Sequence, residues 1–205
     1  MGAKSATSSA NHLEAALAQR LRAALLPGDA PFSDEGLDKA AAFLCSAASQ
    51  RDAGEAAITI ETVSGAAAER FMRIGVINDD MPFLVDSIAS TIAAQGLAID
   101  RLVHPIVAVR RDEAGTLTAI VEGEAAGEKR ESMVYIETRR ADAKIRRALE
   151  SALRTTLGDV RAAVADWPKL QQAMADDADS LADGEGAALL RWLKDGMLTQ
   201  LGHVV

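Results

Sequence analysis

The stretch that decides the fold is residues 70–123, RFMRIGVINDDMPFLVDSIASTIAAQGLAIDRLVHPIVAVRRDEAGTLTAIVEG. Alternating apolar residues predict a strand that ends at Ile77. Apolar residues at helical spacing then predict a helix over residues 82–95, and Gly96 is a natural stop for it. A long strand over residues 97–110, a hairpin turn and a third strand follow. We therefore interpret the stretch as one β-α-β-β unit.

The turn between the first strand and the helix is the candidate site for an effector or a partner, because such units usually meet a ligand or partner there. We call it the acidic turn, and it consists of Asn78, Asp79, Asp80, Met81, Pro82 and Phe83. Asp79, Asp80 and Asp86 can also be read as a metal or acid–base cluster. We favour helix capping for Asp79 and Asp80, because hard cations need more converging oxygens than this stretch supplies.

The flanking sequence predicts helices before the unit and a helical region after it. Asn11 and Glu14 form a capping pair that opens a first helix, and Ser33 caps a second. We expect the chain to comprise a disordered lead-in over residues 1–10, N-terminal helices over 11–50, an α+β domain over 55–157 and a helical extension over 158–205.

Inside the α+β domain, further strands are expected over residues 57–63 and 132–138. Pro105 removes one donor from the long strand, so that strand is expected at a sheet edge or with a bulge. In the extension, Gly158 is expected to interrupt the helix and Pro168 to kink or restart it. Residues 175–186 read as an acidic linker, and residues 198–205 read as the first strand of an absent domain.

Charge and composition exclude several classes of function. The formal charge of −8 and the pI of about 4.9 argue against nucleic acid and against an anionic membrane surface as partners. No apolar run approaches the length of a membrane span, and a lone Cys45 cannot form an internal disulfide. We therefore expect a cytoplasmic protein. The basic residues Lys144, Arg147 and Arg154 share one helix side, which is either a solvated face or a docking surface for an acidic partner.

Catalytic signatures are absent from the sequence. It contains no G-x-G-x-x-G after a strand, no Walker loop, no H-E-x-x-H, no C-x-x-C and no G-x-S-x-G. His104 lies between strand valines and Pro105, where a structural histidine is the favoured interpretation. We assign no catalytic, cofactor-binding or metal residue to this chain.

The acidic turn and its helix resemble the start of an ACT domain, a small regulatory module. Members of that family show an acidic residue, a spacer, Pro-Gly and Leu, then a helix ending near Gly-x-x-Ile. Here those positions are Asp80, Met81, Pro82, Phe83 and Leu84, followed by residues 96–99. More narrowly, INDDMPFLVDSI, LVHPIVAVRRD, ESMVYIE, DVRAAVADWPKL and ALLRWLKDGMLTQLG resemble the N-terminal region of the large bacterial NAD-specific glutamate dehydrogenases.

This resemblance implies an α+β fold with an ACT-like (ferredoxin-like) antiparallel sheet and helices on one face, plus N-terminal helices and a helical C-terminal extension. It implies that NAD binding and the conversion of glutamate to 2-oxoglutarate and ammonia belong to a missing catalytic part. The chain would be a non-catalytic regulatory or assembly domain. Its partners would be other domains or subunits of the same enzyme, including a homo-oligomer formed through a sheet edge or through helices.

One departure from the family pattern bears on function. Amino-acid-binding ACT domains usually place glycine where this chain has Phe83, and a phenyl ring there is expected to fill the space that a ligand needs. We therefore favour protein contact over the alternative, an amino-acid sensor that binds a small effector at the acidic turn. A self-contained enzyme is the least favoured of the three hypotheses.

Overall fold

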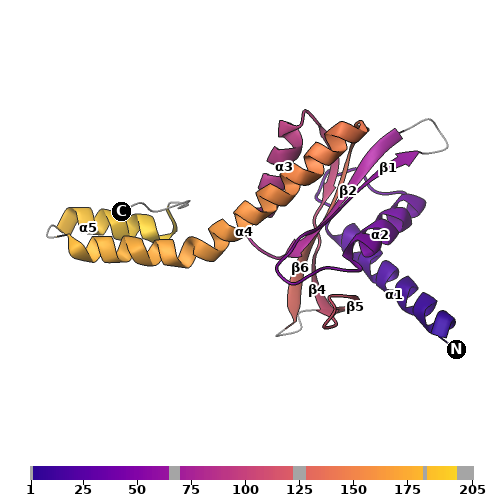
Figure 1. Ribbon diagram of the computed structural model, residues 1–205, viewed down its shortest axis with the longest axis horizontal. Helices are drawn as coiled ribbons and strands as arrows, with labels where there is room; N and C mark the ends of the chain where they lie inside the picture. Colours follow the sequence, from indigo (N-terminus) through magenta and orange to yellow (C-terminus); the bar gives the residue numbers. More distant parts are fainter. Residues whose placement is uncertain (1, 65–69, 122–127, 182–183, 198–205) are drawn as a thin grey trace. The chain divides into compact units, whose positions relative to one another are not determined.

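The computed structural model describes residues 2–64, 70–121, 128–181 and 184–197 (Figure 1). Its contacts divide the chain into two compact units, Met1–Leu157 and Gly158–Val205. The N-terminal helices belong to the first unit, together with the whole sheet.

The first unit is built on one antiparallel sheet, which confirms the expected α+β class. Its strands run in the order β1-β2-β6-β4-β5, and β3 also pairs with β6. Their bounds are Ala57–Ser64 (β1), Arg70–Asp79 (β2), Ile99–Val103 (β3), Ile106–Arg111 (β4), Leu117–Val121 (β5) and Lys129–Arg139 (β6). β6 lies in the middle, with β2 along one side and β3 followed by β4 along the other.

The long strand expected over residues 97–110 is divided into β3 and β4 at His104 and Pro105. β4 lies between β6 and β5, so the edge position predicted for this strand holds for β3 only. The register shifts lie at Ile99/Arg101 and Arg110/Arg111, not at the proline. Pro105 is tolerated because its carbonyl still accepts a hydrogen bond from the Met133 N–H at 3.0 Å, so only one ladder bond is lost.

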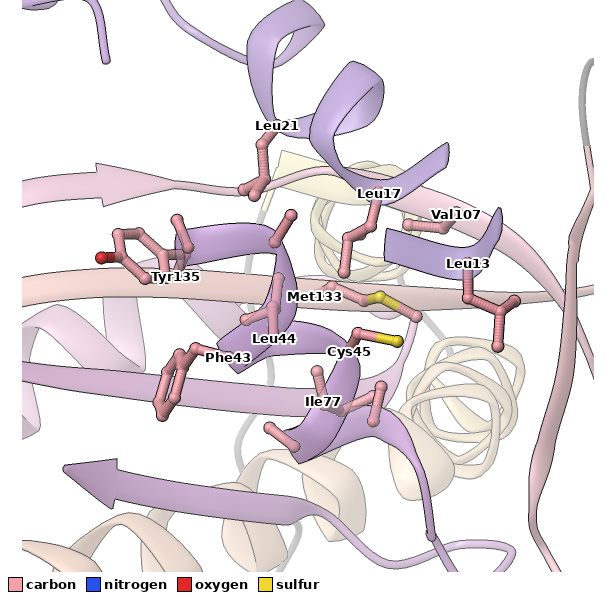
Figure 2. Packing of buried hydrophobic residues seen from close by; sticks show 14 of the residues in the cluster. Leu13, Leu17, Leu21, Phe43, Leu44, Cys45, Ile77, Val107, Met133 and Tyr135 are labelled. Atoms are coloured by element: carbon pink, nitrogen blue, oxygen red, sulfur yellow. The ribbon is translucent and has the colours of Figure 1, made fainter. Parts of the chain in front are cut away.

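One face of the sheet is covered by α1 (Gly2–Ala23) and α2 (Asp34–Ala48). Figure 2 shows leucines of α1 and α2 packed above residues of the strands, and the buried cluster includes Leu17, Leu21, Leu44, Ile77 and Met133. Burial of these side chains is the main stabilisation of this layer.

The predicted start is correct for α2 and wrong for α1. Ser33 caps α2 as expected, because its Oγ accepts a hydrogen bond from the Gly36 N–H at 3.1 Å. α1 begins at Gly2, so the predicted start at Asn11 is wrong, and residues 2–10 are helical where we expected a disordered lead-in. Several alanines favour helix in that segment.

The opposite face of the sheet carries α3 (Leu84–Ala94) and the first part of α4 (Ala143–Ser180), as Figure 1 shows. Thr91 of α3 and Thr156 of α4 share a hydrogen bond of 2.9 Å between their hydroxyls. Buried residues of this second layer are Met72, Ile74, Val76, Val134, Ile136, Leu84, Ile88, Ile92, Leu149, Leu153 and Leu157. The helices of the ACT-like unit therefore share one face, and the N-terminal helices occupy the other.

α4 is one helix from Ala143 to Ser180, which corrects two expectations. Gly158 does not interrupt it, and residues 175–180 of the expected acidic linker are helical. Pro168 lies inside the helix and does not restart it, so of the two expected effects only a kink is left. A glycine in a helix interior costs only about 1 kcal/mol relative to alanine, and buried leucines at helical spacing outweigh that penalty.

The second unit also contains α5 (Gly184–Trp192) and a wide helical turn, η1 (Leu193–Met197). The Gln171 Nε2 of α4 donates to the Lys194 carbonyl at 3.2 Å. The strand expected over residues 198–205 lies outside the described residues, as do most of the loop expected over residues 123–130 and the link at Gly65.

Candidate functional site

The acidic turn joins the end of β2 to the start of α3, as predicted from the sequence. Its two aspartates, however, contact the sheet. Asp79 Oδ1 accepts a hydrogen bond from Arg51 at 2.7 Å. Asp80 Oδ1 accepts one from the Ser132 hydroxyl at 3.0 Å, and the Asp80 N–H donates to the Arg130 carbonyl at 3.1 Å.

The prediction that these aspartates cap α3 is therefore wrong. The N-cap position belongs to Phe83, which makes no side-chain cap hydrogen bond. The physical reason is register: β2 stays paired with β6 as far as Asp79 and Glu131, so the carboxylates meet strand partners before the chain turns into the helix.

Phe83 adopts the left-handed backbone conformation, with φ 69° and ψ 0°. These values match the third residue of a type II turn, a position that favours glycine, and Pro82 precedes it where that turn favours proline. A side chain in this region costs about 1–2 kcal/mol. The Phe83 side chain is 42% exposed, so part of the ring lies at the surface.

A row of side chains crosses the sheet beside the acidic turn. Asn78 and Ile106 lie on either side of Ser132, on the strands β2, β4 and β6. Asn78 and Ser132 are buried, whereas Ile106 is 40% exposed. His104 lies two residues before Ile106, and its buried Nε2 has no hydrogen-bond partner among the described residues. Burial lowers the pKa of His104, while the charge of Asp80 acts in the opposite direction.

A buried ion cluster lies on the other face of the sheet, where the sequence had indicated no site. Glu131 Oε1 accepts hydrogen bonds from Arg51 Nε at 3.1 Å, from Arg51 Nη2 at 2.7 Å and from Arg111 Nε at 2.8 Å. Glu131 Oε2 accepts one from Arg111 Nη2 at 2.8 Å. Arg51 also reaches Asp79, so the cluster connects the loop after α2 with β2, β4 and β6.

The charges of this cluster neutralise one another. Burial raises the pKa of Glu131, but the hydrogen bonds from Arg111 and Arg51 outweigh it and hold that pKa below its usual value. Burial likewise opposes the charge of Arg51, and its bonds to Asp79 and Glu131 outweigh it, so its pKa is raised. The Glu131 carboxylate therefore stays ionised beside two guanidinium groups, as a stable buried pair requires.

The sequence did carry a signal for this cluster. Glu131 falls in the same phase as Met133 and Tyr135, which face the core under α1 and α2. A carboxylate on a core-facing position requires a cationic partner. Periodicity could have identified Glu131, but not its partner Arg51, which is 80 positions away in the chain.

A cavity of about 420 Å³ opens beside the ion cluster. It is lined by Arg51, Asp52, Ala53, residues 109–115, Glu128, Lys129 and Glu131. Its arginines are already bonded: Arg51 and Arg111 to Glu131, and Arg110 to Glu128 at 2.8 Å. We interpret the ion cluster as a structural feature that fixes the loop after α2 to the β4–β5 hairpin.

The described residues offer little reactive chemistry. In the ranges that the structure describes, no three His, Cys, Asp or Glu side chains are grouped to hold a metal ion. Burial, followed by the charge of Glu14, raises the pKa of Cys45, which disfavours the reactive thiolate. None of the described helices is both long and apolar enough to cross a bilayer.

Comparison with known proteins identifies the family to which this chain belongs. The family described as "Glutamate dehydrogenase, ACT1 domain" matches residues 23–153, which is more than half of the chain. The chain belongs to this ACT1 domain family. The match begins at the end of α1 and includes the sheet, α3 and the start of α4, so the second unit lies beyond it.

Curated relatives of this ACT1 domain carry the same enzyme name. The chain is 32% identical over 143 residues to the NAD-specific glutamate dehydrogenase of Pseudomonas aeruginosa. It is 31% identical over 144 residues to the NAD-specific glutamate dehydrogenase of Halomonas elongata. Each alignment covers 63% of this chain and 9% of the relative. The chain therefore spans about a tenth of the length of these relatives.

Proposed function

We propose that this chain is a non-catalytic regulatory and assembly domain of an NAD-dependent glutamate dehydrogenase, and that it acts by contacting other domains or subunits of that enzyme. The observation that carries this proposal is Phe83. It keeps the backbone conformation that glycine adopts easily, yet presents a phenyl ring at the surface. Aromatic side chains held at exposed positions are typical anchors of protein contacts.

Three cavities of the described chain lie away from the acidic turn. The cavity beside the ion cluster is lined by residues outside the acidic turn. A second cavity, of about 350 Å³, lies between α1 and Ile120, and a third, of about 470 Å³, lies in the second unit. A small-molecule site normally encloses most of its ligand, and none of these three cavities includes residues 78–83.

In this proposal the NAD site and the glutamate site belong to the rest of the enzyme, which converts glutamate to 2-oxoglutarate and ammonia. The ACT1 domain itself holds no cofactor, and the enzyme works in the cytoplasm. The names of the curated relatives support the activity.

The second candidate function is an amino-acid sensor at the acidic turn. Two polar groups favour it: the Asp80 carboxylate, which is only partly buried, and His104 Nε2, which lacks a partner among the described residues. An acceptor and a ring nitrogen near one turn are groups that could bind an ammonium or a carboxylate.

Isothermal titration calorimetry of the 205-residue chain against a panel of amino acids separates these two functions. Protein contact predicts no saturable heat with any amino acid, including glutamate. Saturable binding that is lost in Asp80→Asn, and kept in the surface control Asp34→Asn, would establish the sensor instead. Turnover of glutamate with NAD by the chain alone would contradict both functions.

A further inference from the structure

Three strands of the sheet have a neighbouring strand on one side only. Among the residues that the structure describes, the only strand that β1 pairs with is β2, β3 pairs with β6, and β5 pairs with β4. A free strand edge offers its N–H and C=O groups to a strand of another molecule, so folded proteins usually cover such an edge or interrupt it. The three edges differ in these protections.

The edge of β5 is covered from within the first unit. The Leu117 N–H donates to the Ser49 carbonyl at 2.9 Å. At the other end of the strand, Arg20 Nη2 donates to the Val121 carbonyl at 3.2 Å. Because β5 has only five residues, these contacts leave little of its edge open to a partner.

The edge of β3 is short and irregular. β3 has five residues, and its register with β6 shifts between Ile99 and Arg101. Asp100 and Arg101 bring charge to this strand, and Pro105 follows two residues after its end. A short strand with an irregular register and charged residues is a poor template for pairing.

Within the described ranges, the edge of β1 has none of these protections. β1 has eight residues and pairs with β2 from Ala57 to Ser64 without a register shift. It contains no proline and no lysine. Its one charged residue is Glu61, whose carboxylate accepts hydrogen bonds from Arg73 of β2 at 3.0 Å and 3.1 Å. This contact directs the charge toward the neighbouring strand inside the sheet, so the outer edge of β1 remains open to a partner.

β1 also carries apolar side chains that a further strand would cover. Ile58 and Ile60 lie opposite Val76 and Ile74 of β2, on the sheet face that carries α3 and α4. The two β2 side chains are fully buried, whereas Ile58 and Ile60 are only half-buried. A strand added beside β1 would extend this apolar layer and remove the outer sides of both isoleucines from water.

We propose that β1 of one copy of this chain pairs antiparallel with β1 of a second copy, which joins the two sheets into one. The occupant of this edge must be an open strand of similar length, and β1 of a second copy meets both requirements. Since each copy uses the same surface, the contact closes a two-fold dimer. The pairing is one specific form of the assembly role proposed above and rests on it.

The sequence of β1 selects the register of this pair. Residues directly opposite each other in an antiparallel pair lie on one face of the sheet, so the residue on the two-fold axis meets its own copy. The two registers with the longest overlap place either Ile60 or Glu61 on the axis. Glu61 on the axis would set like charges against each other, which destabilises a pair. Ile60 on the axis instead sets Thr59 opposite Glu61 of the second copy, and Ile58 opposite Thr62.

Disulfide trapping of the 205-residue chain in a glutathione redox buffer tests this register. Opposite Cα atoms in an antiparallel pair are about 4.5–5.5 Å apart, which is within the range that a disulfide spans. We expect the Ile60→Cys variant to form a disulfide-linked dimer in non-reducing electrophoresis. The matched control is Ile58→Cys, which would lie about 13 Å from its own copy and is expected to stay monomeric. The wild type controls for Cys45, which is buried.

Sedimentation velocity tests the association itself, and the wild-type chain is expected to sediment as a dimer. Thr59→Glu places a like charge opposite Glu61 in both halves of the pair, so we expect about tenfold weaker association. Thr59→Lys places an opposite charge there, and we expect association at least as strong as that of the wild type. The matched controls are Thr118→Glu and Thr118→Lys on β5, where the threonine is exposed as Thr59 is. Both controls are expected to associate as the wild type does.

Three outcomes would overturn the pairing proposal. These are a wild-type chain that sediments as a monomer, an Ile60→Cys variant that crosslinks no more than Ile58→Cys, or Thr118 variants that change association as much as the Thr59 variants do. Any of them would leave the wider assembly role standing, since that role is tested separately by calorimetry with amino acids. Saturable amino-acid binding by a chain that still forms the β1 dimer would reject the contact-only function and keep the pairing.

Discussion

Phe83 is the residue on which the proposed function of the acidic turn rests. Its φ of 69° is the only positive value at a non-glycine residue in the described chain. Backbone strain of this kind persists where the surrounding structure holds it, and it is common at functional positions. The strain, together with the exposed ring, is what we would expect of a residue kept for contact and not for stability.

The strain at Phe83 can be measured with two substitutions. Phe83→Ala keeps the strained backbone and removes the ring, whereas Phe83→Gly removes both. We expect the glycine variant to exceed the alanine variant by about 1 kcal/mol in free energy of unfolding, measured by urea denaturation. Equal stabilities would show that the turn relaxes when the ring is lost.

Glu131 is the residue that holds the ion cluster together, with less than 1% of its surface exposed. Glu131→Gln would leave Arg51 and Arg111 without their main counter-charge, and breaking a buried pair typically costs about 3–5 kcal/mol. We expect a loss of that size in urea denaturation at neutral pH. The matched control is Glu61→Gln, because Glu61 pairs with Arg73 but its side chain is 49% exposed, and we expect a change below about 1 kcal/mol there.

The same carboxylate predicts a pH dependence. The pKa of Glu131 is lower in the folded chain than in the unfolded one. Its stabilising effect is therefore complete above the unfolded pKa, about 4.3, and is lost as the pH falls through the folded pKa. The stability gap between wild type and Glu131→Gln is expected to shrink below about pH 4; a gap that widens on acidification would contradict the assigned charge state.

At the scale of elements, local patterns were enough to predict the strands and α3, because periodicity is set by near neighbours. The expected helix capped by Ser33, the helix expected over residues 82–95 and the strands β1, β2 and β6 lie within a few residues of their observed bounds. The error at the acidic turn has a tertiary cause. Asp79 and Asp80 fit a local capping rule, but both side chains bind residues far away in sequence. Arg51 donates a hydrogen bond to Asp79, and the Ser132 hydroxyl donates one to Asp80. No local pattern encodes those partners.

The glycines Gly75 and Gly158 show how tertiary packing decides the role of a residue within an element. A Cβ on Gly75 of β2 would meet Phe43 at 3.1 Å and Ala47 at 3.2 Å, so the glycine lets α2 lie close to the sheet. A Cβ on Gly158 of α4 would meet nothing within 4 Å. The sequence identifies both as glycine and cannot distinguish them.

We expect Gly75→Ala and Gly158→Ala to have opposite effects. Gly75→Ala forces α2 away from the sheet and is expected to destabilise by about 1–3 kcal/mol. Gly158→Ala fills open space in a helix and is expected to stabilise by about 1 kcal/mol. Thermal unfolding followed by circular dichroism measures both, and a stabilised Gly75→Ala would refute the close approach of α2.

At the scale of the whole molecule, the family and the fold agree: an ACT1 domain with N-terminal helices added to one face of its sheet. The family resemblance was readable from the order of short motifs. The position of α1 and α2 was not readable, because these helices lie before the motif and their place depends on which sheet face is still uncovered. The central claim is that this domain, through its acidic turn, contacts protein.

Hydrogen–deuterium exchange tests that claim most directly, by comparing residues 78–90 in this chain alone and in a full-length glutamate dehydrogenase that carries it. We predict slower exchange of these residues in the full-length enzyme without any added amino acid. Exchange that is equal in the two proteins, and that slows in both only when an amino acid is added, would contradict the contact role and identify the acidic turn as a ligand site.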